Sequence, residues 1–132
     1  MENKLNETIS ILEKLVSFPT ISGTSTREIN KFIEEYLSQH GLEPVLSYDE
    51  DGERSNIFVT IGPKIDGGVL FNGHTDVVPV EGQKWSTDPF NLTRIDDRLY
   101  GRGSVDMKGF LACALASLPT FSVIEVKKAI TS

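Results

Sequence analysis

A histidine and an aspartate two positions apart follow an apolar stretch near the middle of the chain. The stretch GGVLFNG (67–73) predicts a strand buried on both faces, and His74 and Asp76 come directly after it. Side chains at i and i+2 of an extended chain share a face, so these two lie near each other. A neutral imidazole is a good zinc ligand, and its second nitrogen commonly donates to a carboxylate. An isolated His-x-Asp is more often a surface histidine beside a turn aspartate, so the motif alone does not establish a metal site.

A second candidate is Asp106, in the segment GRGSVDMKGF (101–110), which precedes a predicted helix. An aspartate in this position commonly caps a helix, and for Asp106 alone that interpretation is strong. A carboxylate also has two oxygens that can bridge two metal ions. Asp106 lies 32 positions after His74 (106 − 74), an interval that can return the chain to the same edge of a sheet. The glycines do not form the phosphate-binding pattern G-x-x-x-x-G-K-[ST], and Lys108 is expected to be a solvated or capping charge.

Other chemically versatile residues have simpler explanations. The pair Glu34-Glu35 falls on a predicted helix and is expected to face solvent. His40 closes the same helix, where a cation suits the helix dipole. Trp85 and Phe90 lie in a predicted loop, and we expect them to pack a lid onto the domain, with rimming of a substrate pocket as the alternative.

The hydrophobic pattern predicts helices and strands around these candidates. Apolar residues recur at helical spacing in two early segments, and Ser25 with Glu28 predicts a capping box for the second. Pro19 and Gly41 are the expected stops of these helices. The expected elements are a helix over residues 3–17, a helix from Ser25 to Gly41, strands over 43–48, 56–62 and 67–73, a loop over 81–90, a hairpin turning at Asp96-Asp97, and a helix over 107–118.

Helices, then strands, then a helix indicate an α/β layered domain with a mixed sheet flanked by helices. The tail SLPTFSVIEVKKAITS is expected to leave the last helix at Pro119 and to begin another strand. No further element follows that would finish and cover the sheet. We therefore expect the 132 residues to be an incomplete domain.

Composition narrows the class of protein. Apolar residues make up 39% and charged residues 24% of the 132, which is typical of a globular protein. The net charge of −6 argues against a nucleic-acid partner, which requires a basic patch. Neither a membrane-spanning segment nor a secretory signal is expected, because no apolar run is long enough and the N-terminus is amphipathic. The single cysteine, Cys113, is expected to be a buried structural thiol in a reduced, cytoplasmic setting.

The two motifs together are similar to those of a known family. GHTDVVPVEGQKWSTDPF followed by RLYGRGSVDMKGF resembles the di-zinc amidohydrolases and exopeptidases that include acetylornithine deacetylase, succinyl-diaminopimelate desuccinylase and carboxypeptidase G2. The resemblance runs from about residue 9 to 118, and the order and spacing of the motifs make it specific. LVSFPTISG, WSTDPF and GRGSVDMKGF look most like the acetylornithine deacetylase branch.

The resemblance implies a role for each matched residue. His74 matches a histidine that binds one zinc ion, and Asp106 matches the carboxylate that bridges two. Asp76 belongs to the catalytic machinery as the aspartate that orients that histidine. The bond between Asp106 and Met107 matches one that is cis in the family. The implied cofactor is Zn²⁺, two ions for each complete active site, with Co²⁺ as an alternative.

The chain also departs from the family pattern. The family supplies an adjacent Glu-Glu pair, another acidic ligand and a distant histidine downstream, followed by a dimerisation domain. No Glu-Glu follows Asp106, where Glu125 stands alone. The resemblance therefore implies that residues 1–132 are the N-terminal part of an incomplete zinc-exopeptidase-like catalytic domain, without the remaining ligands and the dimerisation domain.

The implied activity is metal-dependent hydrolysis of the amide bond of a small N-acyl amino acid. The closest branch implies conversion of N-acetylornithine to ornithine and acetate by a homodimer, with a desuccinylase-type or dipeptidase-type hydrolase as alternatives. A catalytic zinc takes three protein ligands and a water, so we expect these 132 residues alone to be inactive. Two non-enzymatic interpretations stay open: a truncated module that binds no metal, and a sheet domain in which the motifs are only turn chemistry.

Overall fold

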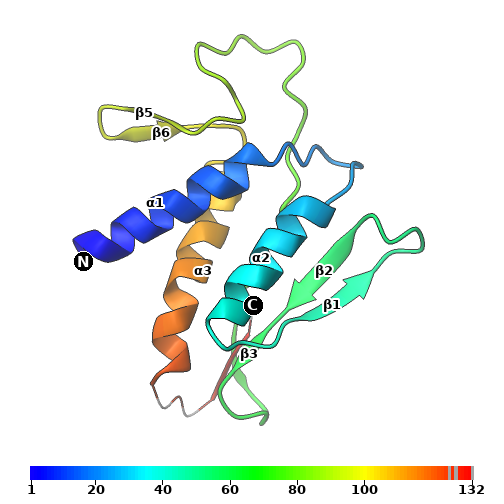
Figure 1. Ribbon diagram of the computed structural model, residues 1–132, viewed down its shortest axis with the longest axis vertical. Coiled ribbons are helices and arrows are strands. Elements are labelled where there is room, and N and C mark those ends of the chain that lie inside the picture. The colour runs from blue at the N-terminus through cyan, green and yellow to red at the C-terminus, as the bar shows by residue number, and fades with distance from the viewer. Residues whose placement is uncertain (125, 127, 132) are drawn as a thin grey trace. The chain divides into compact units, whose positions relative to one another are not determined.

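The computed structural model describes residues 1–124, 126 and 128–131, and it has the expected α/β character (Figure 1). The chain divides into two compact units. Unit 1 comprises residues 1–24 and 73–116, and unit 2 comprises residues 25–72 and 117–132. Helix α3 (Lys108–Ser122) begins in unit 1 and ends in unit 2. Within the described residues, no helix combines the length and apolar character that crossing a bilayer requires.

Helix α1 (Glu2–Ser17) opens unit 1 and confirms the first predicted helix. Its apolar residues repeat at helical spacing and bury one face, formed by Ile11, Leu12, Leu15 and Val16. The chain becomes extended at Phe18, directly before Pro19. The extended conformation is the one that a residue preceding proline favours, so the sequence fixes the end of this helix.

The predicted hairpin of unit 1 is also present. Strands β5 (Thr93–Ile95) and β6 (Arg98–Tyr100) pair antiparallel, and Asp96 occupies the turn with a φ of 53°. The loop over residues 81–90 contains no helix or strand, as expected. Helix α3 extends beyond its predicted end at Pro119 to Ser122. Pro119 falls in the last turn, so its missing N–H removes only one helical hydrogen bond near a fraying end.

Unit 2 begins with helix α2 (Arg27–Gln39), which buries Ile29, Asn30, Ile33 and Leu37. The predicted capping box is wrong. Thr26 is the N-cap, and the Ser25 hydroxyl donates to the Glu53 carbonyl at 3.1 Å and accepts from the Arg27 amide at 3.3 Å, so its partners are not those of a capping box with Glu28. Gly41, with a φ of 73°, ends the helix as predicted, and the Leu42 amide donates back to the Leu37 carbonyl at 3.1 Å.

Strands β1 (Val45–Tyr48) and β2 (Ser55–Phe58) form an antiparallel hairpin, and α2 packs against β2 (Figure 1). The buried Asn30 amide fixes that contact by donating to the Ser55 carbonyl at 2.8 Å. The strand predicted over residues 56–62 is split, because β2 pairs with β1 whereas β3 (Thr60–Ile61) joins another sheet.

The second sheet of unit 2 has the order β3-β7-β4 and is mixed. Strand β7 (Ala129–Thr131) confirms the strand predicted in the tail, and it pairs antiparallel with β3 and parallel with β4 (Gly68–Leu70). The predicted burial of the 67–73 strand is wrong, because Val69 is 55% and Leu70 63% exposed. Strand β4 is an edge of this sheet, and an apolar run does not by itself supply the layers that bury it.

Candidate metal-binding site

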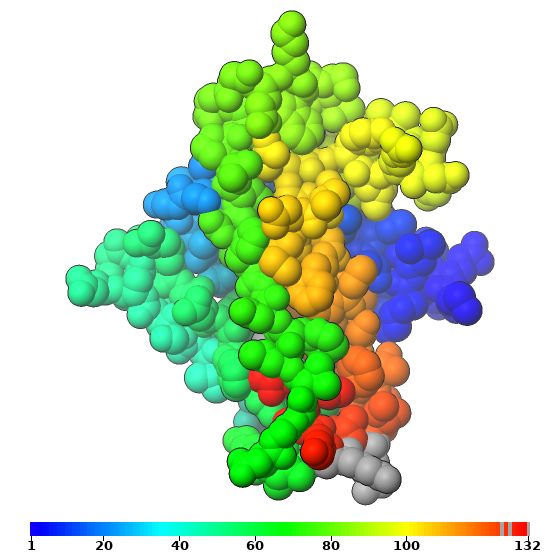
Figure 2. All heavy atoms as spheres, turned by 180° about the vertical axis from the view of Figure 1, so that it is seen from behind, coloured from blue at the N-terminus to red at the C-terminus, as the bar shows by residue number. Residues whose placement is uncertain are grey.

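The site is built in unit 1 from three irregular segments, residues 18–22, 73–78 and 101–107. Figure 2 shows the chain around residues 73–78 running beside the chain around residues 101–107. Gly73 permits a close approach, because a Cβ atom there would lie 2.8 Å from Leu111 Cδ2 of helix α3. A side chain at this position would have to displace the side chain of Leu111.

The His74–Asp76 segment is held by residues 18–22. The Val77 amide donates to the Thr20 carbonyl, and the Ser22 amide donates to the Val77 carbonyl, both at 2.9 Å. The Thr20 hydroxyl also donates to the Thr75 carbonyl at 2.6 Å. These bonds form a short parallel bridge between Ile21 and Val77, so the chain beside His74 is fixed without a long strand.

The His74 ring lies between two carboxylates. Its Nδ1 atom is 2.9 Å from the Asp76 backbone carbonyl and 3.1 Å from Asp76 Oδ1. Its Nε2 atom is 3.1 Å from Asp106 Oδ1. Partial burial acts to lower the pKa of His74, but the Asp76 carbonyl and the Asp106 carboxylate outweigh it and raise that pKa. The structure thus brings together the three residues that the sequence singled out.

The ring orientation determines what fits between His74 and Asp106. A carbonyl can only accept a hydrogen bond, so Nδ1 carries the hydrogen that points at Asp76. In the neutral ring, Nε2 then directs a lone pair at an oxygen of Asp106, and these two acceptors repel each other unless a cation lies between them. Two atoms bound to one tetrahedral zinc ion at about 2.0–2.1 Å are about 3.3–3.4 Å apart. The observed distance of 3.1 Å between His74 Nε2 and Asp106 Oδ1 is close to that separation, so these two atoms could both bind one zinc ion.

Asp76 is itself oriented by Ser22, which the sequence analysis did not identify. The Ser22 hydroxyl donates to Asp76 Oδ2 at 2.5 Å, and this bond, opposed by partial burial and aided by His74, lowers the pKa of Asp76. Asp76 therefore stays ionised and keeps the imidazole in one orientation. No local pattern points to Ser22, because it lies 54 positions before its partner.

Asp106 presents an open carboxylate. Its side chain is 87% exposed, and Oδ1 faces His74. The peptide bond between Asp106 and Met107 is cis, which confirms the expectation drawn from the family resemblance. Asp106 precedes helix α3 by two positions and bonds to His74 through its side chain. A carboxylate with one oxygen held and the other in solvent is suited to bridging cations.

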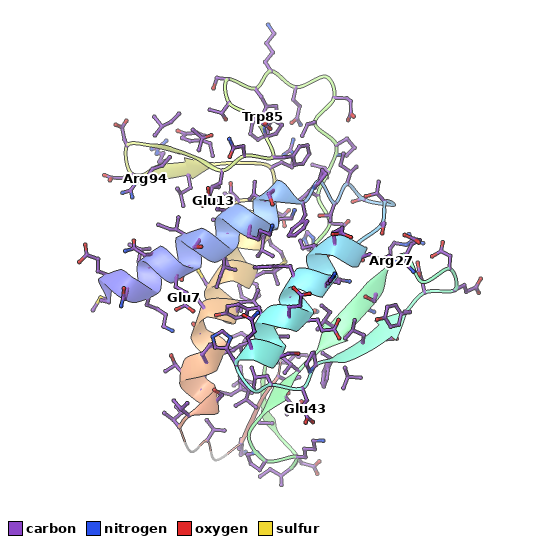
Figure 3. The ribbon with its side chains drawn as sticks, in the orientation of Figure 1. Glu7, Glu13, Arg27, Glu43, Trp85 and Arg94 are labelled. Carbon is purple, nitrogen blue, oxygen red and sulfur yellow. The ribbon has the colours of Figure 1, made fainter. Side chains whose placement is uncertain are left out.

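These residues line one cavity of about 290 Å³, together with the glycine-rich segment 101–106. Arg102 of that segment binds the 81–90 loop: its guanidinium lies 5.2 Å from the Trp85 ring centroid and donates to the Gln83 side chain. Trp85, labelled in Figure 3, does not line the cavity and contacts Arg102 instead. Its loop is thus attached to the segment that carries Asp106.

Lys108 differs most from its predicted role. It was expected to be a solvated or capping charge, but it is fully buried. Its ammonium group donates to the Phe18 carbonyl at 2.8 Å, and burial lowers the pKa of Lys108 to about 8. The sequence analysis did not predict this burial, because a lysine beside glycines and an aspartate is usually a surface residue.

The remaining candidates lie away from the site. His40 ends helix α2, as expected, with Nδ1 2.8 Å from the Tyr36 carbonyl. The prediction that Cys113 is buried is wrong, because it is exposed. Glu125 lies outside the described residues. Within the part of the chain that the structure describes, no group of three or more His, Cys, Asp or Glu side chains is arranged to hold a metal ion.

One family model matches part of the chain. Residues 70–129, which include His74, Asp76 and Asp106, match the model of peptidase family M20/M25/M40. This match covers less than half of the chain and shows that residues 70–129 are similar to this family. The family resemblance predicted from the two motifs is therefore confirmed, and so is the α/β fold class.

Two curated relatives are acetylornithine deacetylases. The protein of Buchnera aphidicola subsp. Schizaphis graminum is 35% identical over 136 residues, and that of Shigella sonnei 36% identical over 135 residues. The alignments cover 98% and 97% of this chain but 35% of each relative. The chain thus spans about a third of the length of these relatives.

Solved structures of the same fold include two peptidases. An M20 family metallo-carboxypeptidase from Sulfolobus solfataricus, Sso-CP2, is 25% identical with a TM-score of 0.79, over 95% of this chain and 29% of its own. Human carnosine dipeptidase 1 is 24% identical with a TM-score of 0.76, over 98% of this chain and 31% of its own. The second likeness shows the fold alone.

Proposed function

We propose that this chain is the N-terminal part of the catalytic domain of a metal-dependent amidohydrolase of the M20 family. The observation that carries the proposal is the placement of His74 Nε2 3.1 Å from Asp106 Oδ1, with Nδ1 held by Asp76. Two acceptors that face each other at this distance require a proton or a metal ion between them. His74 and Asp106 are the proposed ligands, and Asp76 is the proposed positioning residue.

Zinc is the proposed metal, with cobalt as an alternative, and a complete active site would hold two ions. The chemistry that such ions supply is polarisation of an amide carbonyl and activation of water. The residues of this chain contribute the placement: Asp76 fixes the ring of His74, and the exposed oxygen of Asp106 is available for a second ion. The remaining ligands and the general base would come from residues other than these 132.

The proposed substrate is a small N-acyl amino acid, most specifically N-acetylornithine. Support comes from the identity of about a third to the two acetylornithine deacetylases over almost the whole chain. Desuccinylase-type and dipeptidase-type substrates are the alternatives, and the likeness to the metallo-carboxypeptidase favours a peptide-like amide in general. We further propose a cytoplasmic, homodimeric enzyme without nucleic-acid or membrane partners, in line with the single cysteine and the negative charge.

Cobalt(II) binding followed by NMR tests the metal proposal within one chain. Paramagnetic Co²⁺ broadens nearby proton signals, and the chain has two histidines, His74 and His40. We expect the ring signals of His74 to broaden at cobalt concentrations that leave those of His40 sharp. His74→Ala should abolish the binding, whereas His40→Ala should preserve it. Equal broadening of both rings would contradict the proposal.

We also expect the 132-residue chain alone not to hydrolyse N-acetylornithine with added zinc or cobalt. One imidazole and one carboxylate fall short of the three protein ligands of a catalytic zinc. The measurement is release of free amine, compared with a full-length acetylornithine deacetylase. Turnover at a comparable rate would show that these residues contain a complete site.

A further inference from the structure

Lys108 occupies an unusual position for a lysine in unit 1. It is fully buried at the start of helix α3, and its ammonium group donates to the backbone carbonyl of Phe18 at 2.8 Å. Its aliphatic chain packs on Gly103, where an added Cβ would lie 3.3 Å from Lys108 Cδ. The Lys108 amide also donates to the Gly103 carbonyl at 2.8 Å. Lys108 therefore joins the segment that carries Asp106 to the chain that follows α1.

The segment that accepts the hydrogen bond from Lys108, residues 18–22, also holds the His74–Asp76 part of the site. Four residues beyond Phe18, the Ser22 hydroxyl donates to Asp76 Oδ2 at 2.5 Å. Between them, the buried Thr20 donates to the Thr75 carbonyl and accepts from the Val77 amide through its own carbonyl. Residues 18–22 thus connect Lys108 at one end to the neighbours of His74 at the other.

Stability alone does not explain a lysine in this place. Burying an ammonium group costs free energy that one hydrogen bond to a neutral carbonyl only partly offsets. A methionine of similar length would fill the same space without that cost. What a methionine cannot do is hold the Phe18 carbonyl at a fixed distance from the start of α3.

We propose that Lys108 is a positioning residue that, through residues 18–22, keeps Asp106 opposite His74. The inference rests on the proposed metal-binding function of those two residues. Lys108 lies outside the ligand set and acts through the backbone. Its role resembles that of the hydrogen-bonded partners that orient ligands at metal sites, whose loss typically weakens metal binding by about 10–100-fold.

The test compares Lys108→Met with Lys4→Met in the 132-residue chain. Lys4 is a matched control, because its ammonium group also donates to a backbone carbonyl of unit 1, that of Ala116 at 2.7 Å, away from the site. We expect Lys108→Met to unfold at the same temperature as the wild type or higher. At the same time, cobalt(II) affinity should fall about 10-fold or more. Lys4→Met should leave cobalt affinity unchanged.

A second readout needs no metal. The ¹⁵N resonances of the His74 ring report whether Nε2 still faces the Asp106 carboxylate, and they should move in Lys108→Met but not in Lys4→Met. Unchanged cobalt affinity and unchanged His74 resonances in Lys108→Met would overturn the inference. A lower unfolding temperature with an intact site would also overturn it, because Lys108 would then serve stability only. If His74→Ala binds cobalt as well as the wild type, the proposed function fails instead.

Discussion

The two units of this chain are organised in different ways. In unit 2, helix α2 and the β1–β2 hairpin follow one another in sequence and pack directly, with Asn30 bonded to Ser55. In unit 1, the site lies on irregular chain, and each of its parts is held by a segment at least 32 positions away. The difference teaches that regular elements supply the packed framework, whereas long-range polar contacts set the positions of the candidate ligands.

The largest expected effect is a loss of stability, without a change in metal binding, when a core residue of unit 2 is replaced. Ile29 is 0% exposed on helix α2, so Ile29→Ala should lower the free energy of unfolding by about 2–5 kcal/mol. Urea denaturation measures this loss. Under conditions where the variant stays folded, the cobalt response of His74 should be unchanged.

The matched control for this prediction is Ile65→Ala, because Ile65 belongs to the same unit and is 57% exposed. It should change stability by no more than about 0.5 kcal/mol. Loss of the His74 response in folded Ile29→Ala would contradict the comparison, since the site would then depend on the core of unit 2.

Replacing a glycine of unit 1, by contrast, should lower both the stability of the chain and its affinity for cobalt. Gly103 has a φ of 83°, and an added Cβ would lie 2.6 Å from Val77 Cγ1. Gly103→Ala should therefore cost about 1–2 kcal/mol for the left-handed backbone and about 1–3 kcal/mol for overpacking. It should also weaken cobalt binding, because Val77 and Lys108 both adjoin Gly103. Urea denaturation and the cobalt titration measure the two effects.

Gly82 supplies the comparison within the same unit. Its φ is 76°, but nothing lies within 4 Å of an added Cβ. Gly82→Ala should show only the backbone cost, about 1–2 kcal/mol, and normal cobalt binding. Equal behaviour of the two variants would show that the close packing at Gly103 is unimportant.

The smallest expected effect is a pH dependence confined to the β1–β2 turn of unit 2. The backbone amide and guanidinium of Arg54 hold the pKa of Asp49 at about 2, below its usual 3.8. The folded state therefore favours the ionised form. This contribution to stability is complete above pH 3.8 and is lost as the pH falls toward 2. The pair is exposed to solvent, so the effect should be small.

Urea midpoints of the wild type and Asp49→Asn between pH 2 and 5 measure this contribution. The two curves should converge as the pH falls, because the wild type loses the stabilisation by ionised Asp49, which the variant lacks at every pH. The cobalt response at neutral pH should be the same for both. Parallel curves across this range would contradict the assigned cause of the pKa shift.

Local sequence pattern determined much of this chain. Apolar spacing and stop residues fixed helix α1 and the end of α2, and the Asp96-Asp97 turn fixed the β5–β6 hairpin. Such features depend on neighbours within a few positions, and a sequence displays those neighbours directly. The two motifs likewise identified His74, Asp76 and Asp106, which the structure brings together.

Only the tertiary structure decided how those residues are held and which apolar residues are covered. Ser22 and Lys108 acquire their roles from partners 54 and 90 positions away, and no local pattern displays such contacts. The same limit explains the failed burial predictions: Leu70 and Cys113 have apolar sequence neighbours but lie exposed. Periodicity shows which residues can share a face, whereas burial depends on what the folded chain places against that face.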